Sequence, residues 1–193
     1  MKRILFLNGT LVLLCCSFCI GQTVQQKRLG YDLLNQYYTE NKRVLIVSDL
    51  ICNDQAKTKL REYLTQEFLN AAMSIEKRDN GFILEQHVGG NDLAFMRSQV
   101  DHINICKLDS NSFKKSIRKR LITEADIKLL KTALERNFSR NYFFFPLFNE
   151  DRTVVMLFLS KFCGFECHTD GLYFFKLTKN RWQLAFSTLV AFE

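Results

Sequence analysis

Apolar residues recur every three to four positions in four segments between residues 31 and 137 and alternate with polar residues near the C-terminus. The three-to-four spacing is typical of one face of an amphipathic helix. It predicts helices over 31–40, 56–73, 91–101 and 124–137. Between the first two helices, the segment 44–51 is short, apolar and rich in β-branched residues, so it fits a strand or a buried helical segment equally well.

Helix-capping residues precede two of these segments. Asn53 or Asp54 stands before the helix over 56–73, and short polar side chains at this position accept hydrogen bonds from the first free backbone N–H groups. Thr123 followed by Asp126 resembles a capping box with Asp in place of Glu. Both signals support a helical first part of the chain.

Four apolar, β-prone segments then follow, separated by short polar connectors, over 142–148, 154–159, 172–177 and 182–192. Pro146 has no N–H to donate, so its strand begins there or lies at a sheet edge. The last segment alternates cleanly, with one face made of Trp182, Leu184, Phe186, Thr188, Val190 and Phe192. Short connectors favour antiparallel neighbours. The order of helices and then strands predicts an α+β fold, in which a helical N-terminal half packs on a C-terminal antiparallel β-meander.

The first 21 residues read as a secretory signal rather than as part of this domain. Lys2 and Arg3 are followed by an apolar stretch that ends at Gly21, which is the order of a cleavable signal peptide. Polar residues at 8–10 shorten the run below the roughly 20 apolar residues that a spanning helix needs. We expect cleavage after Gly21, export to the periplasm or the extracellular space, and no membrane span in the mature protein.

An alternative is lipid attachment at a signal cysteine, Cys15, Cys16 or Cys19, which would give a lipid-anchored envelope form. In either case the remainder, 22–193, has the length of one domain, helix-rich to about residue 140 and strand-rich over 142–193.

Four cysteines stay after signal removal, and export places them where disulfides persist. Cys163 and Cys167 flank a short loop between two predicted strands, and we expect a disulfide there. The alternatives are free thiols, a redox-active pair, or zinc held together with His168; the spacing suits neither a redox motif nor a standard structural zinc site. Cys52 and Cys106 form the second candidate bridge, with two buried free thiols as the alternative.

The chain is basic, with a formal charge of +7 at pH 7, which becomes +5 once Lys2 and Arg3 leave with the signal. Five cations gather within seven residues, at Lys114, Lys115, Arg118, Lys119 and Arg120. Such a cluster is a weak candidate for binding phosphate or polyanionic glycans. A solvated helix face is the alternative, and nucleic acid is not expected as a partner of an exported protein without interleaved aromatic residues.

The C-terminal quarter resembles uncharacterised exported proteins of Bacteroidetes type. The resemblance rests on Pro146-Leu147-Phe148, on Cys163-Gly164-Phe165-Glu166-Cys167, on Leu172-Tyr173-Phe174-Phe175-Lys176 and on Trp182. Asn180-Arg181 stands where such loops often carry glycine. The resemblance implies export and a β-rich C-terminal half, and it implies no activity.

The sequence therefore favours an exported, non-enzymatic binding or structural module with a protein or small-molecule partner, no cofactor and an oligomeric state left open. No nucleophile, zinc-protease or phosphate-loop motif is present. The alternative is an exported enzyme, such as a hydrolase, with a site assembled from dispersed residues. His168, next to Cys167, is then the first residue to suspect.

Overall fold

The structure is a computed structural model that describes residues 24–42, 44–65, 67–70, 88–102, 105–130, 139–163 and 168–190. The predicted signal segment lies outside these ranges, and so does the loop over 164–167. Both predictions therefore stay predictions.

One sheet organises the fold, with the strand order β2-β1-β3-β5-β6-β7 and with β4 paired to β5. The strands are β1 (Leu45–Val47), β2 (Leu121–Ile122), β3 (Ser139–Phe143), β4 (Leu147–Phe148), β5 (Val154–Cys163), β6 (His168–Thr178) and β7 (Arg181–Val190). Together with the helices, this sheet confirms the α+β class.

The predicted pure antiparallel meander is wrong for one half of this sheet. Strands β5, β6 and β7 are consecutive antiparallel neighbours, as expected. However, β1 lies parallel to both β2 and β3, so the N-terminal half supplies two strands to a mixed sheet. Strands of two or three residues are too short to show a period of two, and their long-range pairing leaves no local signal.

Helices lie in all four predicted segments, but their bounds differ, and residues 131–137 of the last predicted helix lie outside the described ranges. The helices are the N-terminal helix over 24–40, α2 (Asp54–Tyr63), α5 (Gly90–His102), α6 (Lys115–Arg118), α7 (Glu124–Leu130) and a 3₁₀ turn, η1 (Ser110–Ser112). None of the helices in the described ranges is long and apolar enough to cross a membrane.

The predicted caps are present at both helices. The Asn53 side chain accepts a hydrogen bond from the Ala56 N–H at 2.8 Å. Asp126 Oδ2 accepts from the Thr123 N–H at 2.8 Å, and Thr123 Oγ1 accepts from the Asp126 N–H at 3.1 Å, which completes the capping box. The helix expected to reach residue 73 instead ends at Tyr63, and a separate helical stretch covers 67–70.

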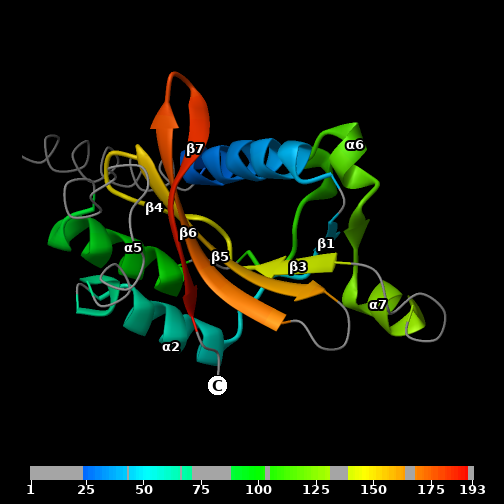
Figure 1. Ribbon diagram of the computed structural model, residues 1–193, viewed down its shortest axis with the longest axis horizontal. Helices are drawn as coiled ribbons and strands as arrows, with labels where there is room; N and C mark the ends of the chain where they lie inside the picture. The colour runs from blue at the N-terminus through cyan, green and yellow to red at the C-terminus, as the bar shows by residue number, and fades with distance from the viewer. Residues whose placement is uncertain are drawn as a thin grey trace, which may run out of the picture.

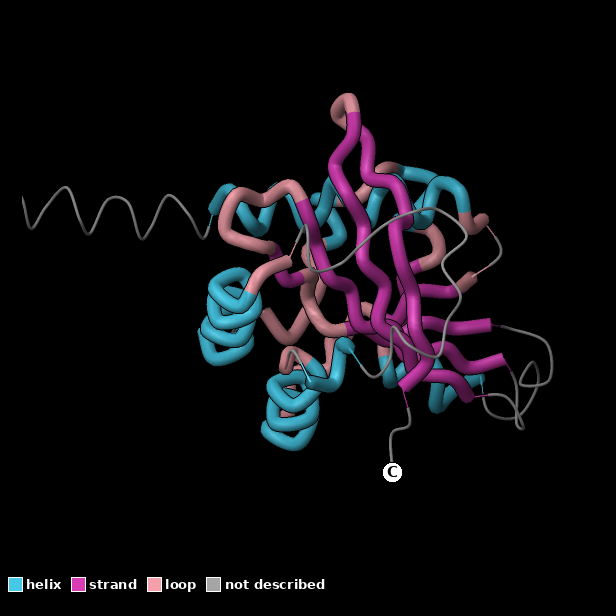
Figure 2. The backbone as a smooth tube through the Cα atoms, turned by 60° about the vertical axis from the view of Figure 1, so that its left-hand side comes forward, coloured by secondary structure: helices cyan, strands magenta, loops and turns pink. Residues whose placement is uncertain are grey.

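Helices cover both faces of the sheet. The N-terminal helix, blue in Figure 1, lies on one face, and α2 and α5 pack on the other. Figure 2 shows the long strands side by side, with the helices set against them. Strand β5 is buried on both faces: Val154, Met156 and Phe158 join the core under α2 and α5, while Val155 and Leu157 join the core under the N-terminal helix.

A bulge in β7 overturns the predicted face of this strand. The pairing register shifts between Phe174 and Phe175 of β6, which leaves Ala185 as an extra residue in β7. Trp182 therefore packs in the core under the N-terminal helix, whereas Val190 packs in the opposite core and Phe186 lies against it. A strict alternation in the sequence does not reveal where an inserted residue reverses the faces.

Pro146 lies between β3 and β4, both of which pair with β5. Three residues, 144–146, stand opposite Phe158 and Leu157, so the ladder again contains an extra residue. Strand β4 begins directly after the proline, as the missing N–H predicted.

Candidate functional site

A cavity of about 280 Å³ lies between the C-terminal half of the N-terminal helix and strands β5, β6 and β7. Its lining combines four aromatic rings and two leucines with four polar or charged side chains, and consists of Leu33, Gln36, Tyr37, Glu40, Asn41, Lys161, Tyr173, Phe175, Trp182 and Leu184. Ligand pockets commonly combine an apolar wall with a few polar groups. The cavity is close to the lower end of their usual size range, roughly 300–1,000 Å³.

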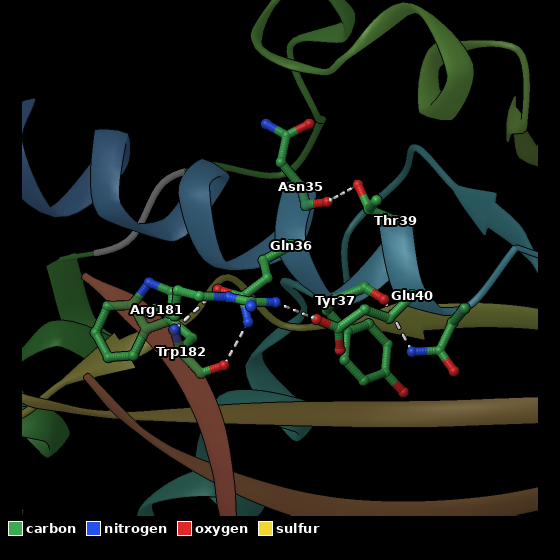
Figure 3. A network of polar contacts seen from close by, with 8 residues as sticks. Asn35, Gln36, Tyr37, Thr39, Glu40, Arg181 and Trp182 are labelled. Atoms are coloured by element: carbon green, nitrogen blue, oxygen red, sulfur yellow. Dashed lines mark hydrogen bonds and ion pairs between the residues drawn. The ribbon is translucent and has the colours of Figure 1, made fainter. Parts of the chain in front are cut away.

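Gln36 joins the helix to the sheet at one wall of this cavity (Figure 3). Its amide oxygen accepts from the Trp182 N–H at 2.8 Å, and its amide N–H donates to the Trp182 carbonyl. The side chain thus replaces a neighbouring strand at the start of β7, which pairs only with β6 among the described strands. This contact holds the helix and Trp182 at a defined distance.

Gly171 shapes the opposite wall. A Cβ atom built there would lie 3.0 Å from Tyr173 Cε2 and 3.1 Å from the backbone oxygen of Thr188. The absence of a side chain lets the Tyr173 ring lie across the strand. As a result, the Tyr173 hydroxyl meets Lys161, whose Nζ donates to Oη at 2.6 Å and lies 4.3 Å from the ring centroid.

Tyr37 supplies a second phenol to the cavity lining. Burial raises the pKa of Tyr37 to about 12, and the nearby Tyr173 contributes to the same shift. The hydroxyl of Tyr37 therefore keeps its proton at neutral pH and is available as a hydrogen-bond donor. The ring packs edge-on against Phe175 at a centroid distance of 5.9 Å.

The acidic group of the lining already has a cationic neighbour. Glu40 pairs with Arg181 at 3.4 Å, and both side chains are largely exposed. The carbonyl groups at the end of the N-terminal helix are also occupied, because Arg120 donates to Tyr38 O at 2.5 Å and to Asn41 O at 2.6 Å. In contrast, no ion pair joins Lys161 to a carboxylate in the described part of the chain.

His168, the residue first suspected for catalysis, is on the other face of the sheet. Its ring stacks on Phe162 at 4.2 Å, and its Nε2 lies 2.9 Å from Ser160 Oγ and 3.0 Å from Asp170 Oδ1. The Asp170 side chain is only 3% exposed. The structure thus brings together a serine, a histidine and a carboxylate that no sequence motif had linked.

This cluster does not have the arrangement of a hydrolytic triad. In a triad, the serine and the carboxylate engage opposite nitrogens of the imidazole, so that one nitrogen takes the proton of the serine while the other is held by the acid. Here both groups approach Nε2. A nitrogen that donates its proton to Asp170 has no lone pair left to activate Ser160. The cluster instead gives a buried carboxylate a hydrogen-bond partner.

The structure joins Cys52 and Cys106 in a disulfide, with a Cα–Cα distance of 5.5 Å. It connects the segment after β1 to the segment before η1, and it agrees with the predicted pairing. The second candidate pair, Cys163 and Cys167, lies outside the described side chains. In the described ranges, no group of three or more His, Cys, Asp or Glu side chains is positioned to hold a metal ion.

The predicted basic cluster divides into two kinds of residue. Arg118 and Arg120 donate to backbone carbonyl groups, which gives them a role in holding loops together. Lys114, Lys115 and Lys119 are exposed. Polyanion binding at these residues stays a prediction.

Sequence reasoning did not find the cavity. Its lining comes from one helix and three strands, and single aromatic residues in such elements look like ordinary core positions. Comparison with protein-family models, with curated proteins and with solved structures finds no match, so the chemistry of the site rests on the geometry of this chain.

Proposed function

We propose that this protein is an exported, non-enzymatic binding domain that holds a small molecule in the cavity under the N-terminal helix. The observation that carries the proposal is the cavity itself, in which four aromatic rings lie beside four polar or charged side chains. Export is supported by the signal-like first 21 residues and by the Cys52–Cys106 disulfide, since disulfides persist in oxidising compartments.

An enzyme is the weaker alternative. None of the described residues that line the cavity is a histidine, and the one carboxylate among them, Glu40, is paired with Arg181. The cluster that does contain a histidine and a buried carboxylate is on the opposite face, with both partners on the same ring nitrogen. A hydrolase needs these groups together and in the triad arrangement.

The test is a binding measurement with three ring systems of the same size and different charge: naphthoate, naphthamide and naphthylmethylammonium. Binding is detected by saturation-transfer NMR, and affinity is measured by calorimetry. The chain has one tryptophan, Trp182, which lines the cavity. Fluorotryptophan labelling therefore gives one fluorine resonance, which should shift when a molecule enters.

Two exposed leucines of β7 provide a matched control. Leu184 is 51% exposed and lines the cavity, whereas Leu189 is 67% exposed and is not part of the lining. Leu184→Gln should weaken binding about fivefold or more, because losing one apolar contact costs about 1 kcal/mol. Leu189→Gln should bind like the wild type. If none of the three probes binds, or if both variants bind like the wild type, the proposed cavity function is wrong.

A further inference from the structure

We infer that the ligand of this cavity is a flat apolar molecule with a carboxylate or a comparable anionic group, held by Lys161, Tyr173 and Tyr37. This inference rests on the proposed function, since it names the chemical class of the molecule that the cavity binds.

The first argument is the balance of donors and acceptors. The Lys161 ammonium has three N–H donors, and one of them is used by Tyr173 Oη at 2.6 Å. Because Tyr173 accepts this bond, its own O–H proton remains to be donated elsewhere. A carboxylate is an acceptor-only group, so it matches an ammonium and two phenols whose protons have no acceptor among the hydrogen bonds of the described residues.

The second argument is charge. Lys161 contributes a cation that is half-buried, and its closest described partner is a neutral phenol. Glu40 could oppose an anion, but its pairing with Arg181 places a compensating cation beside it. Charge-assisted hydrogen bonds are about twice as strong as neutral ones.

The third argument is shape. Tyr37, Tyr173, Phe175 and Trp182 supply aromatic rings from both the helix and the sheet. Rings of this kind favour a flat partner in edge or offset contact. The volume of about 280 Å³ suits a ligand of one or two rings.

The decisive measurement compares naphthoate with naphthamide, which have nearly the same shape and differ in charge. In the wild type, naphthoate should bind about tenfold or more tightly, as expected for a hydrogen bond to a charged group. Lys161→Met should remove this preference while naphthamide binding stays within about twofold. Lys176→Met is the control, because it makes the same charge change in β6 at a residue outside the lining.

Two further variants test the Tyr173 hydroxyl and its position. Tyr173→Phe should weaken naphthoate several-fold more than naphthamide. Gly171→Ala should do the same without touching a donor, because the new Cβ would displace the Tyr173 ring.

Each outcome has a distinct meaning. If naphthoate and naphthamide bind equally well and Lys161→Met changes neither affinity, the ligand is not anionic. If Leu184→Gln lowers both affinities in the same experiment, the proposed binding function still holds. If the ammonium probe binds most tightly, the inference is wrong, and the cavity instead binds a cation through Glu40. Binding of no probe removes both proposals together.

Discussion

The side-chain amide of Gln36 meets both backbone groups of Trp182, so a residue of the N-terminal helix completes the hydrogen bonding of a strand 146 positions later (Figure 3). The same two residues line the cavity. The packing of the helix on the sheet and the geometry of the candidate site therefore depend on one contact.

Replacing Gln36 with Leu should lower the free energy of unfolding by about 1–3 kcal/mol, because both backbone groups of Trp182 lose their partner in a part-buried place. Urea unfolding measures the change. Gln183→Leu alters an exposed glutamine of the same strand and should change stability by about 0.5 kcal/mol or less. An equal loss in both variants would contradict the proposed role of Gln36.

Gly30 is a position where the N-terminal helix approaches the β3–β4 bulge too closely for a side chain. A Cβ there would lie 2.7 Å from Phe145 Cζ, in a well-packed core. Gly30→Ala should therefore destabilise the protein by about 1–3 kcal/mol, the usual range for overpacking. Phe145→Leu in the same chain should recover part of the loss.

The matched control for this prediction is Gly90, at the start of α5, where a Cβ would meet nothing within 4 Å. Gly90→Ala should be neutral or slightly stabilising, since alanine is the better helix former. Thermal unfolding compares the two variants. A similar loss at both glycines would point to a general effect of alanine instead of the clash with Phe145.

The Cys52–Cys106 disulfide should contribute strongly to stability. The two residues are 54 positions apart, and in the chain-entropy model a loop of this length corresponds to about 4 kcal/mol. The double substitution to serine should lower the urea midpoint accordingly. Reduction of the wild type with dithiothreitol should give a similar shift. If neither treatment changes the midpoint, the bridge does not form in the folded protein.

Asp126 should make part of the stability depend on pH. Hydrogen bonds from the Thr123 N–H and hydroxyl lower the pKa of this carboxyl below its ordinary value of 3.8. A pKa that is lower in the folded state stabilises the protein above the unfolded-state pKa, and this contribution is lost as pH falls through the folded-state pKa.

Asp126→Asn should therefore unfold more easily than the wild type at neutral pH. The two proteins should converge in acid, once the wild-type carboxyl is protonated. Urea unfolding of both proteins across an acid-to-neutral pH series measures this. A difference that is independent of pH would show that the charge of Asp126 is not involved.

The pair of His168 and Asp170 should be structural. His168→Leu leaves the buried Asp170 carboxylate without its imidazole partner and should cost about 1–3 kcal/mol. Adding Asp170→Asn removes the buried charge and should recover part of this loss, so the two effects are not additive. A double-mutant cycle by urea unfolding gives the coupling energy. Additive losses would show that the two side chains do not interact.

Short-range sequence patterns were sufficient to predict the elements that have clear capping residues or hydrophobic periodicity. The Asn53 cap, the Thr123–Asp126 capping box, the helix of α5 and the three long C-terminal strands all follow from short-range patterns. These features depend on hydrogen bonds or periodicities within a few residues, which is the range that a sequence pattern records.

Only the tertiary structure decided how these elements meet. The parallel pairing of β1 with β2 and β3, the face reversal at Ala185 and the meeting of Gln36 with Trp182 join residues that are far apart or out of phase in the chain. The cavity has the same origin, because Tyr37, Lys161 and Tyr173 come from separate elements and form one site only after packing. Long-range packing selects such contacts through shape and hydrogen-bond satisfaction, and neither leaves a local pattern in the sequence.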